Sequence, residues 1–237
     1  MTVATLSNLT CGALRAVVAI MTRGLLVAAY EALRARTGLI AFDATSPLTW
    51  VLAFVAYDFV YYGVHRLSHA VPFLWAGHAV HHQAKEMEPS VLLRAGAIAP
   101  FQAFPFYALL AVLGIPTAVY LAVSVVEHTL MAWLHTRRIG SLGPIGWVLN
   151  TPRHHRLHHA ASVAGGGVNL GCVLIVWDRL FGTHRLTEVE PRKFGIARRA
   201  LPLDPLSANL LPWRELLADL GRTHGWRRRL RALVVSA

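Results

Sequence analysis

Four apolar segments most strongly limit what this chain can fold into. A helix needs about 20 mainly apolar residues to cross a bilayer. Residues 47–66 and 116–135 meet this requirement most clearly, and residues 95–113 and 12–30 meet it less well. The sequence therefore predicts an all-α, integral-membrane helical bundle with about four transmembrane or re-entrant helices.

The two weaker segments each contain residues that disturb a simple span. Pro100 and Pro105 would kink a helix in the third segment. Arg15 and Arg23 put charge into the segment 12–30, which therefore either spans the bilayer or lies in its interface. Gly114 begins a Gly-Ile-Pro turn, so the third and fourth helices are expected to form a hairpin.

Composition and charge favour a membrane over nucleic acid as the partner of this chain. Of its 237 residues, 55% are hydrophobic and 15% are charged, whereas soluble domains have about 25% charged residues. The net charge is +11, and no nucleic-acid-binding motif accompanies it. Basic residues near apolar spans typically mark the cytoplasmic side. We expect one domain over 1–237, a catalytic region over 47–184, a basic cytoplasmic tail over 185–237, and a multi-pass location in the cell's inner membrane.

Histidines form three sets with helical spacing. Residues at i, i+3 and i+4 share one helix face, so the imidazoles of a set can reach the same ion. His128 and His135, seven residues apart, are expected on one face of the helix between the second and third sets. With four spans, all these histidines gather at the cytoplasmic membrane face as a helical cap. The three sets are His65 and His69; His78, His81 and His82; and His155, His158 and His159.

This many histidines indicate a metal centre. Eight or more imidazoles exceed the shell of one structural zinc, and no cysteine pair completes such a site. Imidazole binds Zn, Cu, Fe and Ni, so the ligands alone leave the metal open. With no acid inside a set to serve as a base, O₂ chemistry on iron is favoured over hydrolysis. A histidine-rich metal-binding or metal-transport protein and a haem-binding electron carrier are the alternatives.

The order of the three sets, with a lone histidine before the last, resembles the fatty acid hydroxylase/sterol desaturase superfamily of membrane di-iron oxygenases. Similar stretches also occur at Asp58–Tyr62, Asn150–His159 and Trp177–Thr183. The resemblance implies two Fe ions, O₂, and hydroxylation or desaturation of a lipid, fatty-acyl or sterol-like substrate. Electrons would come from a separate redox partner or a small-molecule reductant. The implied ligands are His65, His69, His78, His81, His82, His135, His155, His158 and His159.

Four further residues are candidates for supporting roles. His128 and His154 are possible additional ligands or partners of ligands, and Asp58 is expected to accept an imidazole N–H and fix its orientation. Arg94 matches the alkylglycerol monooxygenase-like branch, which the last histidine set also resembles most, and is a candidate contact for an anionic headgroup. The stretch that begins at Gln83 departs from that branch, so ether cleavage and pterin use are not carried over.

Overall fold

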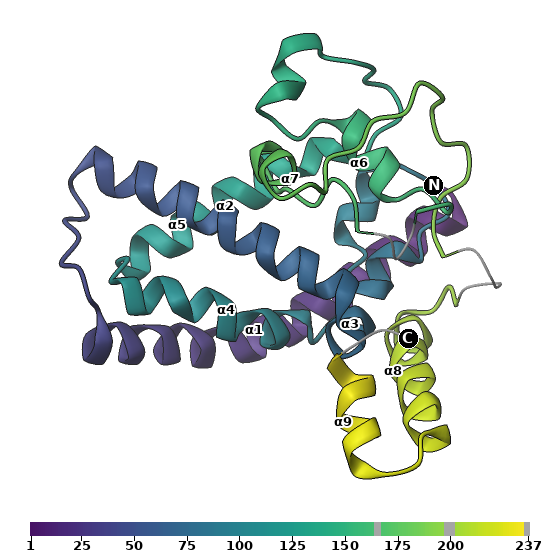
Figure 1. The fold of residues 1–237 in the computed structure, drawn as a ribbon, viewed down its shortest axis with the longest axis horizontal. Coiled ribbons are helices and arrows are strands. Elements are labelled where there is room, and N and C mark those ends of the chain that lie inside the picture. The colour runs from purple at the N-terminus through teal and green to yellow at the C-terminus, as the bar shows by residue number, and fades with distance from the viewer. Residues whose placement is uncertain (164–166, 197–201, 235–237) are drawn as a thin grey trace.

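The structure is a computed structural model that describes residues 1–163, 167–196 and 202–234. Within these residues the chain is all-α, as predicted: apart from two isolated β-bridges it contains helices and loops, and no strand. The helices shown in Figure 1 are α1 (Val3–Thr37), α2 (Pro47–Ala70), α3 (Pro72–His82), η1 (Pro89–Leu93), α4 (Ala99–Leu113), α5 (Thr117–Met131), η2 (Ala132–Leu134), η3 (Gly143–Trp147), α6 (Pro152–His158), α7 (Val176–Leu180), α8 (Pro205–Arg222) and α9 (Trp226–Val234).

Helices α1, α2, α4 and α5 run back and forth as a bundle (Figure 1). Three helical segments among the described residues are long and apolar enough to cross a membrane: α1, α2, and α5 extended through η2. Helix α4 has 15 residues and is about 22 Å long, less than the roughly 30 Å hydrocarbon core. Of the four segments expected to span or re-enter the membrane, three are therefore long enough to cross it, and α4 is a shorter apolar helix. The weak first segment lies within α1, the longest helix of the described chain.

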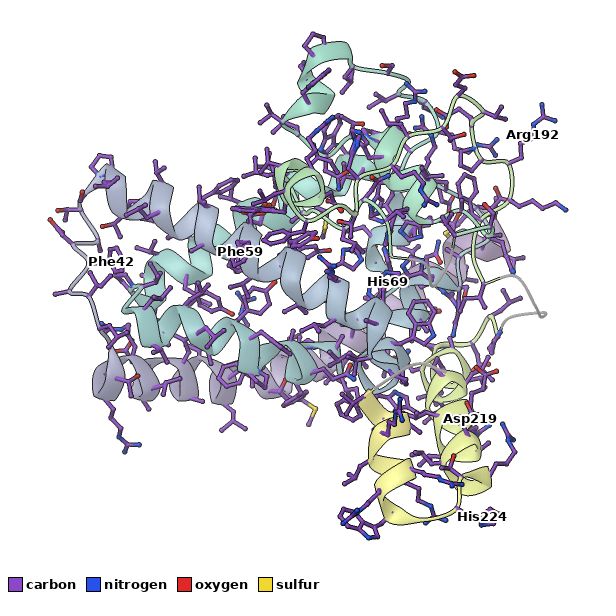
Figure 2. All side chains as sticks on the ribbon, in the orientation of Figure 1. Phe42, Phe59, His69, Arg192, Asp219 and His224 are labelled. Atoms are coloured by element: carbon purple, nitrogen blue, oxygen red, sulfur yellow. The ribbon has the colours of Figure 1, made fainter. Side chains whose placement is uncertain are left out.

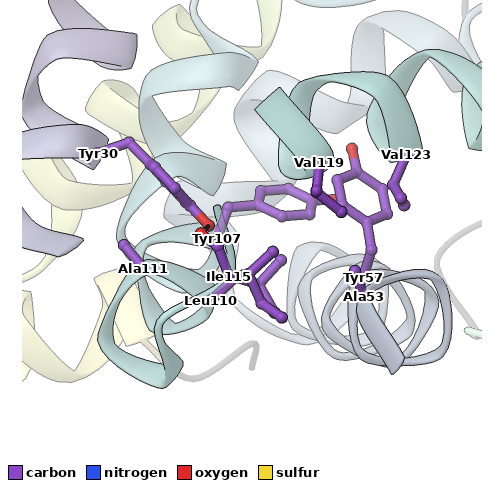
Figure 3. Packing of buried hydrophobic residues seen from close by; sticks show 9 residues of the cluster. All are labelled: Tyr30, Ala53, Tyr57, Tyr107, Leu110, Ala111, Ile115, Val119 and Val123. Carbon is purple, nitrogen blue, oxygen red and sulfur yellow. Dashed lines mark hydrogen bonds between the residues drawn. The ribbon is translucent and has the colours of Figure 1, made fainter. Parts of the chain in front are cut away.

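The loop after α1 and the turn after α4 meet at one end of the bundle. The backbone N–H groups of Leu39 and Ile40 donate to the carbonyls of Val112 and Leu113, at 2.9 and 3.2 Å. Figure 3 shows the apolar core beside this end, where the hydroxyl of Tyr30 donates to the carbonyl of Ile115 at 3.0 Å. These contacts hold the expected α4–α5 hairpin against α1.

Gly114 makes this turn possible, and its replacement by alanine is expected to destabilise the protein. Its φ is +101°, and an added Cβ would lie 2.0 Å from the carbonyl oxygen of Ile40. We expect Gly114→Ala to cost about 2–3 kcal/mol from backbone strain and displacement of the neighbouring loop. Thermal unfolding in detergent measures this loss. Gly24→Ala is the matched control, because nothing lies within 4 Å of its added Cβ. Equal unfolding temperatures for the two variants would contradict this account.

The histidines gather at the opposite end of the bundle. In Figure 2, His69 lies near the end of α2, far from Phe42 at the turn end. The N-terminus and the α8–α9 hairpin lie on the histidine side (Figure 1). The region predicted as a basic tail contains these two helices, and α8 packs against α3 and α1. Parts of that predicted tail, residues 197–201 and 235–237, lie outside the described residues.

Candidate metal centre

Helices α2 and α3 place the first two histidine sets side by side. Helix α2 ends at Ala70, and after Val71 alone Pro72 begins α3, since proline is favoured in a first helical turn. This tight corner brings the last two turns of α2, with His65 and His69, against α3. The pair of elements is among the most closely packed in the chain.

The short helix α6 carries the third set. Pro152 occupies its first turn, and Thr151 caps its N-terminus in a capping box with His154. His155 and His158 lie on the helix and His159 is its C-cap residue.

His135 reaches the site by a route that differs from the prediction. Helix α5 ends at Met131, a 3₁₀ turn follows over Ala132–Leu134, and His135 comes after that turn. His128, still on α5, is therefore not on a shared helix face with His135. The prediction of one helix carrying both residues is wrong, because the change to a 3₁₀ turn alters the rotation per residue.

The nine histidines implied as ligands come together in two groups. Within each group one nitrogen of every ring lies within 4.8 Å of those of all the others. Each group draws residues from distant parts of the sequence, so only the folded chain forms it. The first group consists of His65, His69, His78, His82 and His158, and the second of His81, His135, His155 and His159.

The spacing of the ring nitrogens suits a bound ion. In the first group, Nε2 of His78 lies 3.0 Å from Nε2 of both His65 and His82. In the second, Nε2 of His135 lies 3.2 Å from that of His81 and 2.9 Å from that of His155. Two nitrogens bound at right angles to one ion, each at about 2.1 Å, lie about 3.0 Å apart. The donor set therefore fits two first-row transition metal ions.

Backbone carbonyls fix the orientation of three of these rings. The Nδ1–H groups of His65, His81 and His158 donate to the carbonyls of Leu170, Arg94 and Val168 at 2.8–2.9 Å. In each ring this leaves the lone pair of Nε2 for the group interior, which is the arrangement of metal-binding histidines. Nε2 of His158 and both ring nitrogens of His69 are buried with no hydrogen-bond partner. Bound metal would satisfy such atoms.

Burial keeps the imidazoles outside the spanning helices neutral. It lowers the pKa of His81 to about 4, although the hydrogen bond to the Arg94 carbonyl raises that pKa and the charge of Arg15 lowers it. Burial likewise lowers the pKa of His155 and His158 well below the ordinary value. A neutral imidazole is the form that binds metal, so these rings are competent ligands at neutral pH.

Two candidate histidines lie outside both groups. The ring of His128 bonds through Nδ1 to the carbonyl of Ser124 at 2.7 Å. His154 has its Nδ1 next to the backbone N–H and hydroxyl of Thr151, where it caps α6, and its ring lies against His184. His154 therefore supports the helix that carries the third set, and the structure gives it no place among the grouped nitrogens.

The side chains of Asp58 and Arg94 bind backbone groups of the protein. Asp58 was expected to bind an imidazole and Arg94 a lipid headgroup, and the structure corrects both expectations. Asp58 is fully buried, and its carboxylate accepts the backbone N–H of Val173 and the indole N–H of Trp177 at 2.8 and 2.7 Å, not an imidazole N–H. Arg94 is 3% exposed, so it contacts no headgroup. Its guanidinium donates to the carbonyl of Val80 and to other groups of the protein.

Sequence reasoning missed a buried carboxylate that orders the loop behind the first group. Asp178 accepts the backbone N–H groups of Leu170 and Gly171, both at 2.7 Å. The hydroxyl of Thr183 donates to the same carboxylate at 2.6 Å. Asp178 thus fixes the segment whose Leu170 carbonyl orients His65. The signal in the sequence is the position of Asp178 directly after Trp177 in the Trp177–Thr183 stretch.

A second missed group lies in the bundle beside this site. The ligand atoms of Glu127, Asp58 and Cys172 lie within 4.8 Å of one another, and all three side chains are fully buried. The hydrogen-bond partners of Asp58 account for its own burial. The signal was available in the sequence, because Glu127 is an acid within an apolar segment.

An apolar cavity of about 350 Å³ runs from the histidines into the bundle. Its walls come from α1, α2, α4 and α5, with aromatic side chains such as Tyr57, Phe104 and Tyr107. Histidines from both groups face it. A water-poor channel that ends at paired imidazole groups can admit a hydrocarbon chain to them. The histidines in its wall are His65, His78, His81, His128 and His155.

Residues 50–183 match the family described as fatty acid hydroxylase. The chain belongs to the fatty acid hydroxylase family. This confirms the resemblance found in the sequence, and the matched residues include all nine grouped histidines.

Several curated relatives of this chain have names that describe enzymes acting on lipids. The chain is 34% identical to an alkylglycerol monooxygenase of Xenopus tropicalis over 221 residues, or 91% of this chain and 49% of that protein. It is 38% identical to the alkylglycerol monooxygenase of Homo sapiens, over 68% of this chain and 36% of that one. An ornithine lipid hydroxylase of Rhizobium tropici is 33% identical over 56% of this chain and 40% of its own length.

The aligned region makes up a larger share of this chain than of those relatives. The chain spans about half the length of the curated relatives it matches, or less. No solved structure matches it. The family and the geometry of the histidine groups are therefore the basis for assigning an activity.

Proposed function

We propose that this chain is a membrane-bound, O₂-dependent lipid hydroxylase whose two histidine groups each bind one iron ion. The observation that carries the proposal is the meeting of these groups at the end of an apolar cavity within a membrane-type helical bundle. Relatives named as lipid monooxygenases and hydroxylases support it. Removal of a second hydrogen by the same centre would give desaturation instead.

The protein residues bind the metal, hold the lipid chain and exclude water in this reaction. His65, His78 and His81 line the cavity and belong to the groups, so they border both metal and substrate. The bound iron supplies the O₂ chemistry that oxidises a C–H bond. The aromatic and aliphatic wall holds the lipid chain and excludes water. In the net reaction one oxygen atom enters the C–H bond and the other leaves as water, with two electrons and two protons from a separate redox partner or a small-molecule reductant.

The cavity supports lipid oxidation over metal transport. A transported ion would need polar ligands across the bundle, yet beyond the histidine end the wall is mostly apolar. Arg15 and Arg23, which also line it, would repel a metal cation. The expectation of a transport protein therefore gains no support from the cavity.

We place the histidine end at the cytoplasmic face of the membrane. The strongly basic helix α9, with Arg227, Arg228, Arg229 and Arg231, lies on the same side as the histidines. Basic residues next to membrane spans favour the cytoplasmic side. Accessibility of a cysteine introduced at His224 to a membrane-impermeant reagent tests this placement.

Purified protein is expected to contain about two iron ions per chain, because each histidine group offers four or more nitrogens. Metal analysis checks this number. Comparative lipidomics of membranes with and without the protein, under O₂ with a reductant, is expected to show a lipid gaining one oxygen or losing two hydrogens. Stoichiometric zinc, together with no O₂ consumption under any reductant, would refute the function.

A further inference from the structure

Two arginines of α1 line the cavity, and the proposed reaction leaves them unexplained. Arg15 is partly buried and Arg23 is exposed. Among the residues that the structure describes, neither guanidinium has a carboxylate partner. A cation on a membrane-spanning helix is costly and marks a functional position by default.

The two arginines lie at different depths of the cavity. They are eight residues apart, or about 12 Å along the helix axis. Arg15 interacts electrostatically with Tyr61, and its charge acts on His81 of the second histidine group. Arg23 acts on Tyr120, farther along the cavity wall. Helix α1 begins on the histidine side of the bundle (Figure 1), so Arg15 is the cation nearer the metal end of the cavity.

The surroundings of Arg15 suit an anion that carries a hydrocarbon chain. Tyr61, whose hydroxyl donates to Sδ of Met131, interacts electrostatically with Arg15, and His128 adds a polar group to the wall near both arginines. The rest of the wall is mainly aliphatic and aromatic, and the volume of about 350 Å³ is at the lower end of the range for ligand pockets. One chain fits such a space better than two.

We propose that Arg15 binds the anionic group, a carboxylate or a phosphate, of a single-chain lipid whose tail fills the cavity. The proposal rests on the proposed function, because it names the substrate class of that same site. A guanidinium can bind either anion through two parallel hydrogen bonds, and low dielectric strengthens them. Since Arg15 is at the metal end, the oxidised carbon is expected in the half of the chain next to the anionic group.

Binding to the metal-free protein tests this assignment apart from catalysis. Hexadecanoic acid, hexadecyl phosphate and hexadecanol share one chain length and differ in charge. Each is measured as radiolabelled lipid retained by immobilised protein in a non-ionic detergent. We expect the wild type to bind the acid or the phosphate about ten- to a hundredfold more tightly than the alcohol, the range for a charge-assisted hydrogen bond. Whichever anion is preferred identifies the head group.

Substitutions on α1 complete the test. We expect Arg15→Gln to remove the charge preference while hexadecanol binds as before, and Arg15→Lys to keep part of it. Arg36→Gln is the matched control, because Arg36 is exposed on the same helix and outside the cavity wall; it should keep the full preference. Unchanged unfolding temperatures show that the variants are folded.

Three results would overturn the assignment: equal binding of all three lipids by the wild type, equal weakening of all three by Arg15→Gln, or the same loss in Arg36→Gln.

Failures of the two proposals can be told apart. Oxygenated product without any charge preference would refute the role of Arg15 and leave the oxygenase function. Charge preference without product from iron-loaded protein, O₂ and reductant would leave the anion site and refute the oxygenase. Oxygen found in the methyl-terminal half of the product would contradict the placement of the head group at Arg15.

Discussion

His158→Ala is expected to abolish lipid oxidation and to lower the iron content below two ions per chain, because the first group loses one of its five ligands. His158 belongs to the first group, and its buried Nε2 has no hydrogen-bond partner within the protein. Its Nδ1 is held by the carbonyl of Val168, so the ring directs Nε2 to the interior of the group as a ligand. Loss of one ion of the pair should lower turnover about a thousandfold or more.

The second group provides the reciprocal variant. His159→Ala should spare the first group and remove the other ion, with the same loss of turnover. His224→Ala is the control, because His224 is exposed and outside both groups. Iron analysis and product formation under O₂ are measured on the same preparations. Full iron content and turnover in His158→Ala would show that the group is not a metal site.

Local spacing in the sequence was sufficient to predict the three histidine sets. In α2, His65 and His69 are one helical turn apart, and in α3 the set from His78 to His82 has the same periodicity. Helical geometry alone therefore places each set on one face. Which histidines make up each group was not predictable, because each group combines residues that are far apart in the sequence.

The supporting residues could not be predicted, because their partners are far away in the sequence. Asp58 was expected to hold an imidazole, being two helical turns from His65, but it bonds to the backbone of Val173, 115 residues later. Arg94 was placed at the surface, yet it is buried against Val80, Ser7 and Gln83. A charged residue in an apolar region signals a partner, and only the fold identifies which one.

The ends of helices were a further limit. The histidine spacing predicted one helix through His128 and His135, whereas α5 stops at Met131. No proline or glycine marks this stop, and the following 3₁₀ turn is stabilised by packing of Leu134 and Met131 with Cys172. Tertiary contacts of this kind decide where a helix ends when its own sequence does not.

Asp178→Ala is expected to destabilise the protein by about 3–5 kcal/mol. The side chain is fully buried and accepts three hydrogen bonds, from the N–H groups of Leu170 and Gly171 and the hydroxyl of Thr183. Each donor left unsatisfied by the change costs about 1–3 kcal/mol. Thermal unfolding in detergent should show a fall in Tm of roughly 10 °C or more.

The loss should extend to the metal centre, because Asp178 holds the loop whose Leu170 carbonyl orients His65. We therefore expect Asp178→Ala to retain less iron in the first group even below its unfolding temperature. Asp178→Asn keeps one acceptor oxygen but turns an amide N–H₂ toward a backbone donor, so its loss should be intermediate. Asp219→Ala is the control, since Asp219 is exposed and its ion-pair partner among the described residues is Arg222 on the surface. This variant should change stability by no more than about 0.5 kcal/mol. An Asp178→Ala protein as stable and as rich in iron as the control would mean that the loop finds its position without this carboxylate.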